Sequence, residues 1–580
     1  MTEHLAALRR AIAAAGLNGF LVPRSDEQLG EYVPAYAERL AWLTGFTGSA
    51  GLAIVLADRA AVFSDGRYTL QLTQEVDAGQ YELVHSTEVP PHIWLAPHAA
   101  GLRIGYDPWL MSEAAVGRYS EAGITMVPGP NLIDAIWADR PPHPNALAWA
   151  HSLDHAGLSS AEKRAQLAQS LREARQGAAV VTDTAAVAWL FNLRGADLPY
   201  TPCALGFAIL YADATAALFM DAAKRAGLGE WLGPDVRGLE RDALPGALAA
   251  LSGQTVRVDS TASPAWFAQT LRAAGAIVVD GPDPCGLPKA CKNPVEQAGA
   301  RAAHRVDGVA LCRFLHWLDS AGVGQTECAV ADRLRAFRTA DPAFRGESFP
   351  AIAGAGPNGA VIHYRAQPGQ DRVLAPDQLF LVDSGGQYAA GTTDVTRTVW
   401  TGPGAAPDDI RARFTQVLRG HVALATVQFP VGVSGPHLDA FARRPLWDAG
   451  LDYDHGTGHG VGSFLSVHEG PAGISRAGRM VPLAPGMILS NEPGFYLPGA
   501  YGLRLENLML VQEAAPKFLR FETLTLAPFD HRLLDPALLL PAEATWLAAY
   551  HARVLAEIGP LLEGPALAWL VAACGAWATR

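Results

Sequence analysis

Apolar segments that run directly into carboxylates are the feature that most constrains how this chain can fold. In LFLVDSGGQYAAGTTDVTRT (379–398) a strand-like apolar run ends in Asp383, and Asp394 follows eleven residues later. Glu492 ends a second apolar run, and Glu506 lies inside a third. A buried carboxylate costs free energy unless a cation or hydrogen-bond donors compensate it. The fold must therefore bring positive charge to the place where these segments meet.

Histidines accompany these carboxylates. The glycine-rich stretch DYDHGTGHGVGSFLSVHEGP carries His455, His459 and His468, and GPNGAVIHYRA presents His363 after a short apolar run. The spacing of the first two does not indicate a helical zinc site, because each glycine around them would cost a helix about 1 kcal/mol. The glutamate that a helical HExxH site needs is also replaced by Gly456. A single histidine is most often a hydrogen-bonded core residue, so none of the four is informative alone.

The carboxylates need more positive charge than nearby side chains offer. Taken singly, Asp383 would only start a turn and Glu506 would only pair with Arg504. Taken together, the four carboxylates have Arg504, and Arg397 as a second candidate, as their cationic neighbours in the sequence. Two divalent cations would neutralise all four, as in two-metal hydrolytic sites. Oxygen-rich ligation with one imidazole suits manganese, cobalt or iron as well as zinc.

Composition excludes several classes of protein. The chain has 580 residues, of which 49% are hydrophobic and 18% charged, and its formal net charge is -12. Its 45 Lys and Arg form no runs, which argues against a nucleic-acid partner. Six scattered cysteines without a CxxC pair indicate free thiols in a reducing compartment.

Neither end of the chain predicts a targeting or membrane segment. The first residues form the pattern of an amphipathic helix that ends at Gly16, and they lack the apolar core of a signal peptide. The late apolar stretch LLEGPALAWLVAACGAWATR is interrupted by Glu563, Gly564 and Pro565, which leaves too short a run to span a bilayer. We therefore expect a cytoplasmic protein with no membrane partner.

Two segments of the first half resemble each other. Residues 41–68 and 188–221 both place AWL before apolar strand-like runs and an aspartate, and a helix and a short apolar strand precede each of them. This alternation predicts α/β layering and two related domains in tandem. Proline-rich segments at 139–147 and 280–297 interrupt both periodicities and are the predicted linkers.

We therefore expect a mixed α/β (α+β) chain with two related N-terminal α/β domains and a C-terminal third unit. The third unit would include a C-terminal extension from about residue 515 and would open with a long helix. Asn293 is the predicted cap of that helix, Pro294 its first residue, and Glu296 completes a capping box. The predicted domain ranges are 1–142, 143–286 and 287–580.

The carboxylates and one histidine also carry a resemblance to a known family. In order and in surrounding sequence they match the five metal ligands of the pita-bread metallopeptidases: Asp383, Asp394, His459, Glu492 and Glu506. The chain resembles the cytosolic-type Xaa-Pro aminopeptidases (aminopeptidase P) in their long three-domain form. The likeness rests on PNGAVIHY, DSGGQYAAGTTDVTRT, GLDYDHGTGHGVGSFLSVHEGP and GLRLEN, and upstream on EYVPAYAERLAWLTGFTGSAG, SDGRY and WLFNLRGAD.

The resemblance implies a pita-bread catalytic domain and a role for each ligand. Asp383 would bind one metal, His459 and Glu492 the other, and Asp394 and Glu506 would bridge both. A hydroxide between the metals would be the nucleophile, and Glu492 would take the proton from the attacking water and pass it to the leaving nitrogen. The implied cofactors are two divalent ions per chain, manganese first, with zinc or cobalt as alternatives.

Further residues are implied to surround the substrate. Arg504 would steady a ligand carboxylate, and Tyr496 would help to form a wall of the proline pocket. Arg67, in SDGRY, matches a residue of the N-terminal domain that reaches the substrate in the family. Asn491 departs from the acidic residue usual in the family, and we expect it to tune activity without abolishing it. Three histidines would line the cleft and stabilise the oxyanion: His363, His455 and His468.

The implied activity is removal of the N-terminal residue from peptides whose second residue is proline. Such a bond has no N–H, so a peptidase that hydrogen-bonds this hydrogen cannot use it. Prolidase, which cleaves Xaa-Pro dipeptides with the same ligands, and a non-catalytic pita-bread binding protein are the alternatives. Chain length and the paired N-terminal domains favour the aminopeptidase, and the complete ligand set disfavours the binding protein. A homodimer formed through the catalytic unit is also implied.

Overall fold

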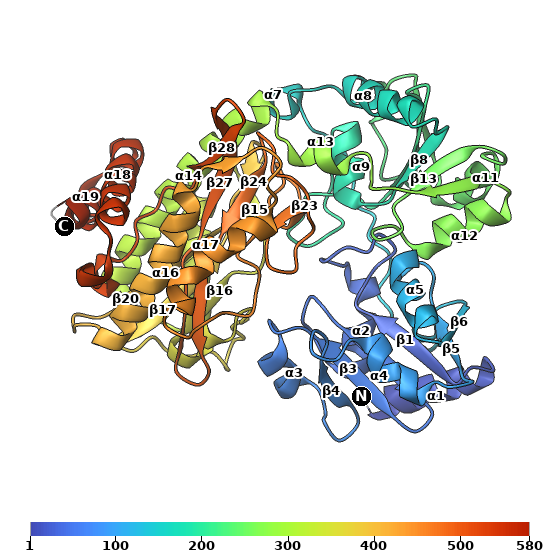
Figure 1. Ribbon diagram of the computed structural model, residues 1–580, viewed down its shortest axis with the longest axis horizontal. Coiled ribbons are helices and arrows are strands. Elements are labelled where there is room, and N and C mark those ends of the chain that lie inside the picture. Colours follow the sequence, from blue (N-terminus) through green and yellow to red (C-terminus); the bar gives the residue numbers. More distant parts are fainter. Residues whose placement is uncertain (1, 579–580) are drawn as a thin grey trace. The chain divides into compact units, whose positions relative to one another are not determined.

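The computed structural model describes residues 2–578, which divide into two compact units between Gly286 and Leu287 (Figure 1). Both units combine helices with mainly mixed or antiparallel sheets. The prediction of a mixed α/β fold is therefore confirmed.

The N-terminal unit contains two six-stranded sheets of the same design. In each sheet the first pairing is parallel, the next two are antiparallel and the last two are parallel. The prediction of two related α/β domains is thereby confirmed. The first sheet has the order β4-β3-β2-β1-β5-β6, with β1 Gly19–Pro23, β2 Leu52–Leu56, β3 Ala60–Ser64, β4 Glu82–His85, β5 Arg103–Tyr106 and β6 Thr125–Pro128. The second has the order β12-β11-β10-β8-β13-β14, with β8 Ala178–Val181, β10 Phe207–Tyr211, β11 Ala216–Phe219, β12 Val236–Leu239, β13 Thr255–Val258 and β14 Ile277–Asp280.

The two segments whose sequences resemble each other form equivalent elements of these sheets. In the first, α2 (Arg39–Thr44) leads into the antiparallel pair β2 and β3. In the second, α9 (Thr184–Phe191) leads into the pair β10 and β11. The predicted N-terminal helix is α1 (Thr2–Ala14), whose apolar face is buried, and it ends near Gly16, whose φ of 65° favours glycine.

The C-terminal unit opens with α14 (Pro294–Ala321), capped as predicted. The Asn293 side chain accepts hydrogen bonds from the Val295 and Glu296 N–H groups, and Glu296 accepts one from the Asn293 N–H. Three further long helices follow α14 in the chain: α15 Glu327–Thr339, α16 Asp408–Thr426 and α17 Gly435–Trp447.

Two sheets of this unit carry the predicted site residues. A three-stranded sheet has the order β16-β17-β20, with β16 Ile352–Ala355, β17 Gln378–Ser384 and β20 Val395–Thr401. A six-stranded sheet has the order β21-β28-β27-β24-β22-β23, with β21 Phe429–Pro430, β22 Gly458–Gly460, β23 Glu469–Ile474, β24 Ile488–Asn491, β27 Asn507–Ala515 and β28 Phe518–Thr523. The hairpin of β25 (Gly494–Leu497) and β26 (Tyr501–Arg504) lies between β24 and β27 in sequence.

Helices α16 and α17 pack on the six-stranded sheet. Leu424 of α16 and Leu438 of α17 share one buried cluster with Leu489, Met509 and Leu519 of the sheet. This packing holds the strands rigidly, so side chains at their ends are placed precisely.

Residues after Thr523 leave the sheet and form a C-terminal layer, coloured red in Figure 1. Helices α18 (Pro541–Ile558) and α19 (Gly564–Ala578) share a buried cluster with α16. Among residues 2–578, no helix is both long and apolar enough to cross a membrane. All six cysteines lie in this range and are free thiols.

Candidate metal centre

Strand pairing brings the two aspartates together. Strands β17 and β20 are antiparallel, and Asp383 lies opposite Thr396. Asp394 lies directly before β20, two residues from Thr396, so the alternation of the strand carried back by one residue places both on the same face. Asp383, Asp394 and Thr396 therefore point to one side of the sheet.

The two glutamates are brought together by a second antiparallel pairing. Strand β24 pairs with β27 through Asn491 opposite Asn507. Glu492 and Glu506 are the next residues outward, so both point away from the face that the asparagines occupy. The sequence predicted Glu506 inside a strand, but it lies between β26 and β27. Its N–H donates to the Thr396 carbonyl, so the segment between β26 and β27 is hydrogen-bonded to β20.

His459 completes the cluster from β22. Carboxylate and imidazole atoms of Asp394, His459 and Glu506 lie within 4.8 Å of one another. His459 Nε2 is 3.4 Å from Asp394 Oδ2 and 3.7 Å from Glu492 Oε1. The His459 ring is oriented by its Nδ1–H, which donates to the Gly460 carbonyl at 2.9 Å.

Two carboxylate oxygens of this cluster lack a hydrogen-bond partner among the described residues. They are Asp383 Oδ1 and Asp394 Oδ1, and both are buried. A buried oxygen of an ionised carboxylate left in this way is costly. Oxygen-rich donors with one imidazole, converging and partly unsatisfied, fit hard or borderline divalent metal ions.

Arg504 supplies the cationic side chain at this site. Its Nη2 donates to Asp383 Oδ2 at 2.7 Å and its Nη1 to the Tyr496 hydroxyl at 2.6 Å. The other predicted arginine, Arg397, does not bind a carboxylate among the described residues. Its guanidinium donates to main-chain carbonyls, among them that of Glu506 at 2.7 Å, and to Asn507 Oδ1 at 2.8 Å. One arginine therefore compensates charge, while the other fixes the backbone of a predicted ligand.

Arg504 also holds His455 in place, through the hydroxyl group of Tyr496. The His455 Nδ1–H donates to the Gly456 carbonyl at 2.7 Å, and its Nε2 lies 2.9 Å from the Tyr496 hydroxyl. Because the Tyr496 oxygen already accepts from Arg504, its own proton is directed to His455 Nε2. The Tyr496 pKa is raised by burial to about 12, so this proton stays in place at neutral pH.

The other two histidines are connected to the cluster by different kinds of contact. The ring of His468 is 4.3 Å from that of His459, edge to face. His363 follows Ile362, whose carbonyl accepts from Arg504 Nη2 at 3.4 Å. Both segments are thus tied to residues that surround the carboxylates.

Known families match the chain along almost its whole length. Metallopeptidase family M24 matches residues 298–513, and the C-terminal region of peptidase M24 matches 517–577. Two Creatinase/Prolidase N-terminal domain models match 4–136 and 139–296. The probable Xaa-Pro aminopeptidase P of Laccaria bicolor is 38% identical over 99% of this chain and 93% of its own length. Aminopeptidase P2 of Arabidopsis thaliana is 37% identical over 97% of this chain and 86% of its own.

A solved structure matches equally completely. The X-prolyl aminopeptidase of Caenorhabditis elegans, described as a cytosolic enzyme with a di-nuclear active site, superposes with a TM-score of 0.93. It shares 32% identity over 99% of both chains. The chain belongs to metallopeptidase family M24, in its aminopeptidase P branch. The resemblance found in the sequence is thereby confirmed.

Burial and mutual repulsion perturb the ionisation of this M24 cluster. Burial raises the pKa of Asp383 to about 6, and burial likewise raises the pKa of Glu492. Burial and then the charges of Asp394 and Asp383 raise the pKa of Glu506 well above its ordinary value. Burial alone would lower the pKa of His459, but its hydrogen bond to Asp394 and the charge of Glu492 raise it to about 9. Without metal, the cluster therefore holds protons at neutral pH.

Metal binding by this chain is expected to release protons and to weaken as pH falls. The pKa of His459, at about 9, keeps its imidazole protonated at pH 7, and the raised pKa of Glu506 favours its protonated form, whereas ligation needs a neutral imidazole and an ionised carboxylate. Lower pH favours the protonated forms and so opposes the metal. Calorimetric titration of metal-free protein in buffers of different ionisation enthalpy measures the protons released. An affinity that stays constant between pH 6 and pH 9 would contradict this prediction.

Asn491, the departure from the usual family sequence, lies on the face away from the cluster. It is fully buried, and its Nδ2 donates to the His421 carbonyl at 2.9 Å. An ionised aspartate could not make this donation. The expectation that Asn491 only tunes activity stays a prediction.

Several supporting residues were missed in the sequence. Thr396 Oγ1 donates to Glu506 Oε2 at 2.8 Å, and Thr398 Oγ1 donates to the Arg504 carbonyl at 2.9 Å. Both follow Asp394 at intervals of two residues. Side chains two residues apart share one face of a strand, so this spacing could have predicted them. Ser490 Oγ accepts from the His459 N–H at 2.9 Å, which no local pattern indicates.

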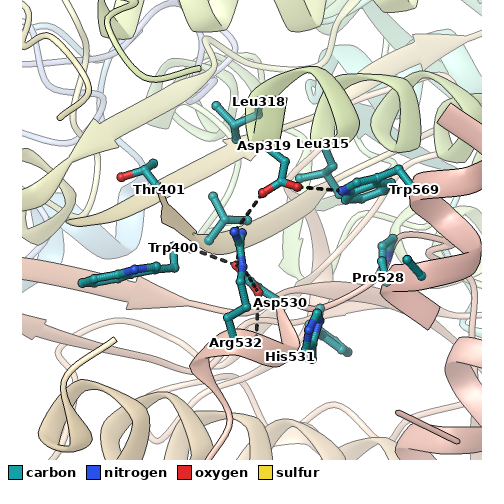
Figure 2. Close-up of a pocket in the computed structure, with 14 residues that line it drawn as sticks. Leu315, Leu318, Asp319, Trp400, Thr401, Pro528, Asp530, His531, Arg532 and Trp569 are labelled. Carbon is teal, nitrogen blue, oxygen red and sulfur yellow. Dashed lines mark hydrogen bonds and ion pairs between the residues drawn. The ribbon is translucent and has the colours of Figure 1, made fainter. Parts of the chain in front are cut away.

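A separate cavity of about 250 Å³ lies among α14, β20 and the C-terminal layer. Figure 2 shows its polar side chains bonded to one another: Arg532 joins Asp319 and Asp530, and Trp569 Nε1–H donates to Asp319. None of the predicted site residues lines it. Its polar groups satisfy each other, so its chemistry does not suggest catalysis.

Arg67 lies in the N-terminal unit, directly after β3. Its guanidinium forms two hydrogen bonds with Asp65, at 2.9 and 2.7 Å, and lies 5.3 Å from the centre of the Tyr68 ring. The side chain is 28% exposed, so part of it is accessible to solvent. Its predicted contact with substrate stays a prediction.

Proposed function

We propose that this M24 metallopeptidase is an Xaa-Pro aminopeptidase, which releases the N-terminal residue from peptides with proline in second position. The observation that carries the proposal is the convergence of Asp394, His459 and Glu506 within 4.8 Å. Full-length relatives named Xaa-Pro aminopeptidase P support the substrate class. We also place the enzyme in the cytoplasm, as its relative from Caenorhabditis elegans is described.

The proposed cofactors are two divalent ions, with manganese first and zinc or cobalt as alternatives. Asp383 would hold one ion, His459 and Glu492 the other, and Asp394 and Glu506 both. When bound, the ions would supply Lewis acidity and activate water for attack. The buried unpaired oxygens of Asp383 and Asp394 support a cation at each of these two aspartates.

Glu492 is the proposed proton carrier. It is the most exposed carboxylate of the cluster, with 18% of its side chain exposed, whereas Asp383 is 11% and Asp394 5% exposed. Ser490 Oγ lies 3.4 Å from Glu492 Oε1, which leaves its other oxygen for exchange with water and the leaving nitrogen.

The cleft histidines receive different proposed tasks. His363 and His468 would donate to the substrate carbonyl as negative charge develops on its oxygen. The resemblance implied the same task for His455, but both of its ring nitrogens already have partners, so we instead assign it the positioning of Tyr496 at the proline pocket. Arg504 would keep Asp383 and Tyr496 in place, and Arg67 would contact the substrate from the N-terminal unit.

A proline-second peptide is expected to be cleaved at least about a hundredfold better in kcat/KM than its alanine analogue. Burial of the pyrrolidine ring contributes about 1–2 kcal/mol at ~25 cal/mol per Å². The alanine analogue adds an N–H that must lose water without an acceptor, at roughly 1–3 kcal/mol. Each ~1.4 kcal/mol is tenfold in rate. Arg-Pro-Pro and Arg-Ala-Pro, compared with the same metal loading, provide the test.

Outcomes of this assay separate the alternatives. Equal rates on both tripeptides would point to a broad aminopeptidase instead. Cleavage of Xaa-Pro dipeptides but not tripeptides would identify a prolidase. Metal-stripped protein should be inactive, and adding back each divalent ion in turn identifies the effective metal. A chain without bound metal or hydrolysis would favour the binding-protein alternative.

We further propose a homodimer formed through the catalytic unit. The resemblance to the pita-bread family supports this assembly. Sedimentation equilibrium of the purified chain measures it directly, and a monomer at micromolar concentration would contradict it.

A further inference from the structure

Two buried lysines bind one buried carboxylate beside the proposed cleft. Lys289 Nζ lies 2.8 Å from Glu469 Oε2, and Lys292 Nζ forms a short contact with Glu469 Oε1. All three side chains are at most 5% exposed. Lysines are rarely buried so fully, because an ammonium group loses much hydration energy. The burial of two ammonium groups therefore costs free energy, which makes a functional role for this cluster worth seeking.

The lysines are themselves fixed to the catalytic unit. Lys289 lies in α13 (Gly286–Ala290). The Lys292 N–H donates to the Gly486 carbonyl at 2.9 Å, and its own carbonyl accepts from Gln297 at 2.7 Å. The next residue, Asn293, caps α14. Both ammonium groups therefore start from an anchored backbone.

Glu469 connects these lysines to the site. It directly follows His468 in sequence and begins β23, where it pairs with Gly460 of β22. Gly460 in turn follows the proposed ligand His459, whose ring is 4.3 Å from that of His468. The segment before His468 has little regular structure, so Glu469 is the first strand residue that can fix it.

The approach of β23 to β22 leaves no space for adjustment. A Cβ atom on Gly460 would lie 2.1 Å from the Glu469 carbonyl oxygen, so only glycine fits there. Any shift of Glu469 therefore moves the backbone beside both His459 and His468. Misplacement by about 1 Å near reacting groups can cost roughly 10²-fold in rate.

We propose that Lys289 and Lys292 are positioning residues that act through Glu469 to hold His468 in the orientation its reaction needs. The inference rests on the proposed function, because it assigns His468 a task in peptide cleavage. The lysines do not touch substrate. They fix the carboxylate, the carboxylate fixes the start of β23, and the start of β23 fixes the imidazole.

A double-mutant cycle distinguishes this role from general stabilisation. Lys292→Met removes one ammonium group and leaves Glu469 paired with Lys289, so the fold should survive. We expect kcat to fall about tenfold with little change in KM and full metal content. In the His468→Ala background the same substitution should change kcat by less than about twofold, because the group it positions is absent. Lys292→Arg should restore most of the wild-type rate.

A matched control tests the effect of losing any buried lysine. Lys224 of the N-terminal unit is 4% exposed and pairs with Asp197. Lys224→Met should lower thermal stability while leaving kcat unchanged. A tenfold fall in kcat with Lys224→Met would overturn the inference, as would an equal loss from Lys292→Met in both backgrounds.

A readout independent of activity separates this inference from the proposed function. The His468 ring C–H signal in a histidine-labelled spectrum can be assigned by its absence in His468→Ala. We expect Lys292→Met to shift or broaden it in metal-free protein, and Lys292→Arg to preserve it. An unchanged signal would overturn the inference even if the enzyme is active. A wild-type chain inactive on Xaa-Pro peptides would refute the proposed function, and the spectrum would still test the positioning.

Discussion

Asp394→Asn is expected to give a folded chain that binds fewer than two metal ions and cleaves Xaa-Pro peptides at the background rate. Asparagine preserves the size of the side chain but removes a negative charge that both proposed ions share. It also places N–H donors, which repel cations, where Asp394 has a buried oxygen without a partner. Elemental analysis gives the metal content, and circular dichroism confirms the fold.

A second aspartate of the same unit provides the control for this substitution. Asp319 pairs with Arg532 and Trp569 beside the cavity of Figure 2, away from the proposed ligands. Asp319→Asn should keep two metal ions per chain and near wild-type kcat. Full metal occupancy with near-normal activity in Asp394→Asn would refute the assignment of Asp394 as a bridging ligand.

Local patterns predicted the architecture because they depend on neighbouring residues. The cap formed by Asn293 and Glu296, and the segments 41–68 and 188–221, are short-range features, and all appear as expected. Apolar runs that end in charge likewise located Asp383 and Glu492. Their predicted roles rest on the family resemblance, and the structure adds their contacts, Asp383 with Arg504 and Glu492 with His459.

Other features depend on contacts between distant segments, which no local pattern records. Glu469 meets lysines that lie 177 and 180 residues earlier in the chain. Arg397 and Arg504 each lie within three residues of a predicted ligand in the sequence, yet only the fold directs one to carbonyls and the other to Asp383. Tyr496 likewise receives its partner His455 from a different strand region. Such pairings follow from sheet register, which is set by the whole fold.

His363→Ala and His468→Ala are expected to keep two metal ions and to lose kcat by roughly 10²–10³, the usual effect of removing one donor to a developing oxyanion. Neither imidazole is among the atoms that converge within 4.8 Å, whereas that of His459 is.

His459→Ala is therefore the informative comparison, since it should lose metal as well as activity. The three variants remove the same side chain from the same unit, so differences among them report position and not residue type. KM should change little in His468→Ala, because an interaction formed mainly in the transition state affects kcat. If His363→Ala or His468→Ala lost metal as readily as His459→Ala, the division between ligand and cleft residues would be wrong. The edge-to-face contact of His468 with His459 would then be part of the metal site itself.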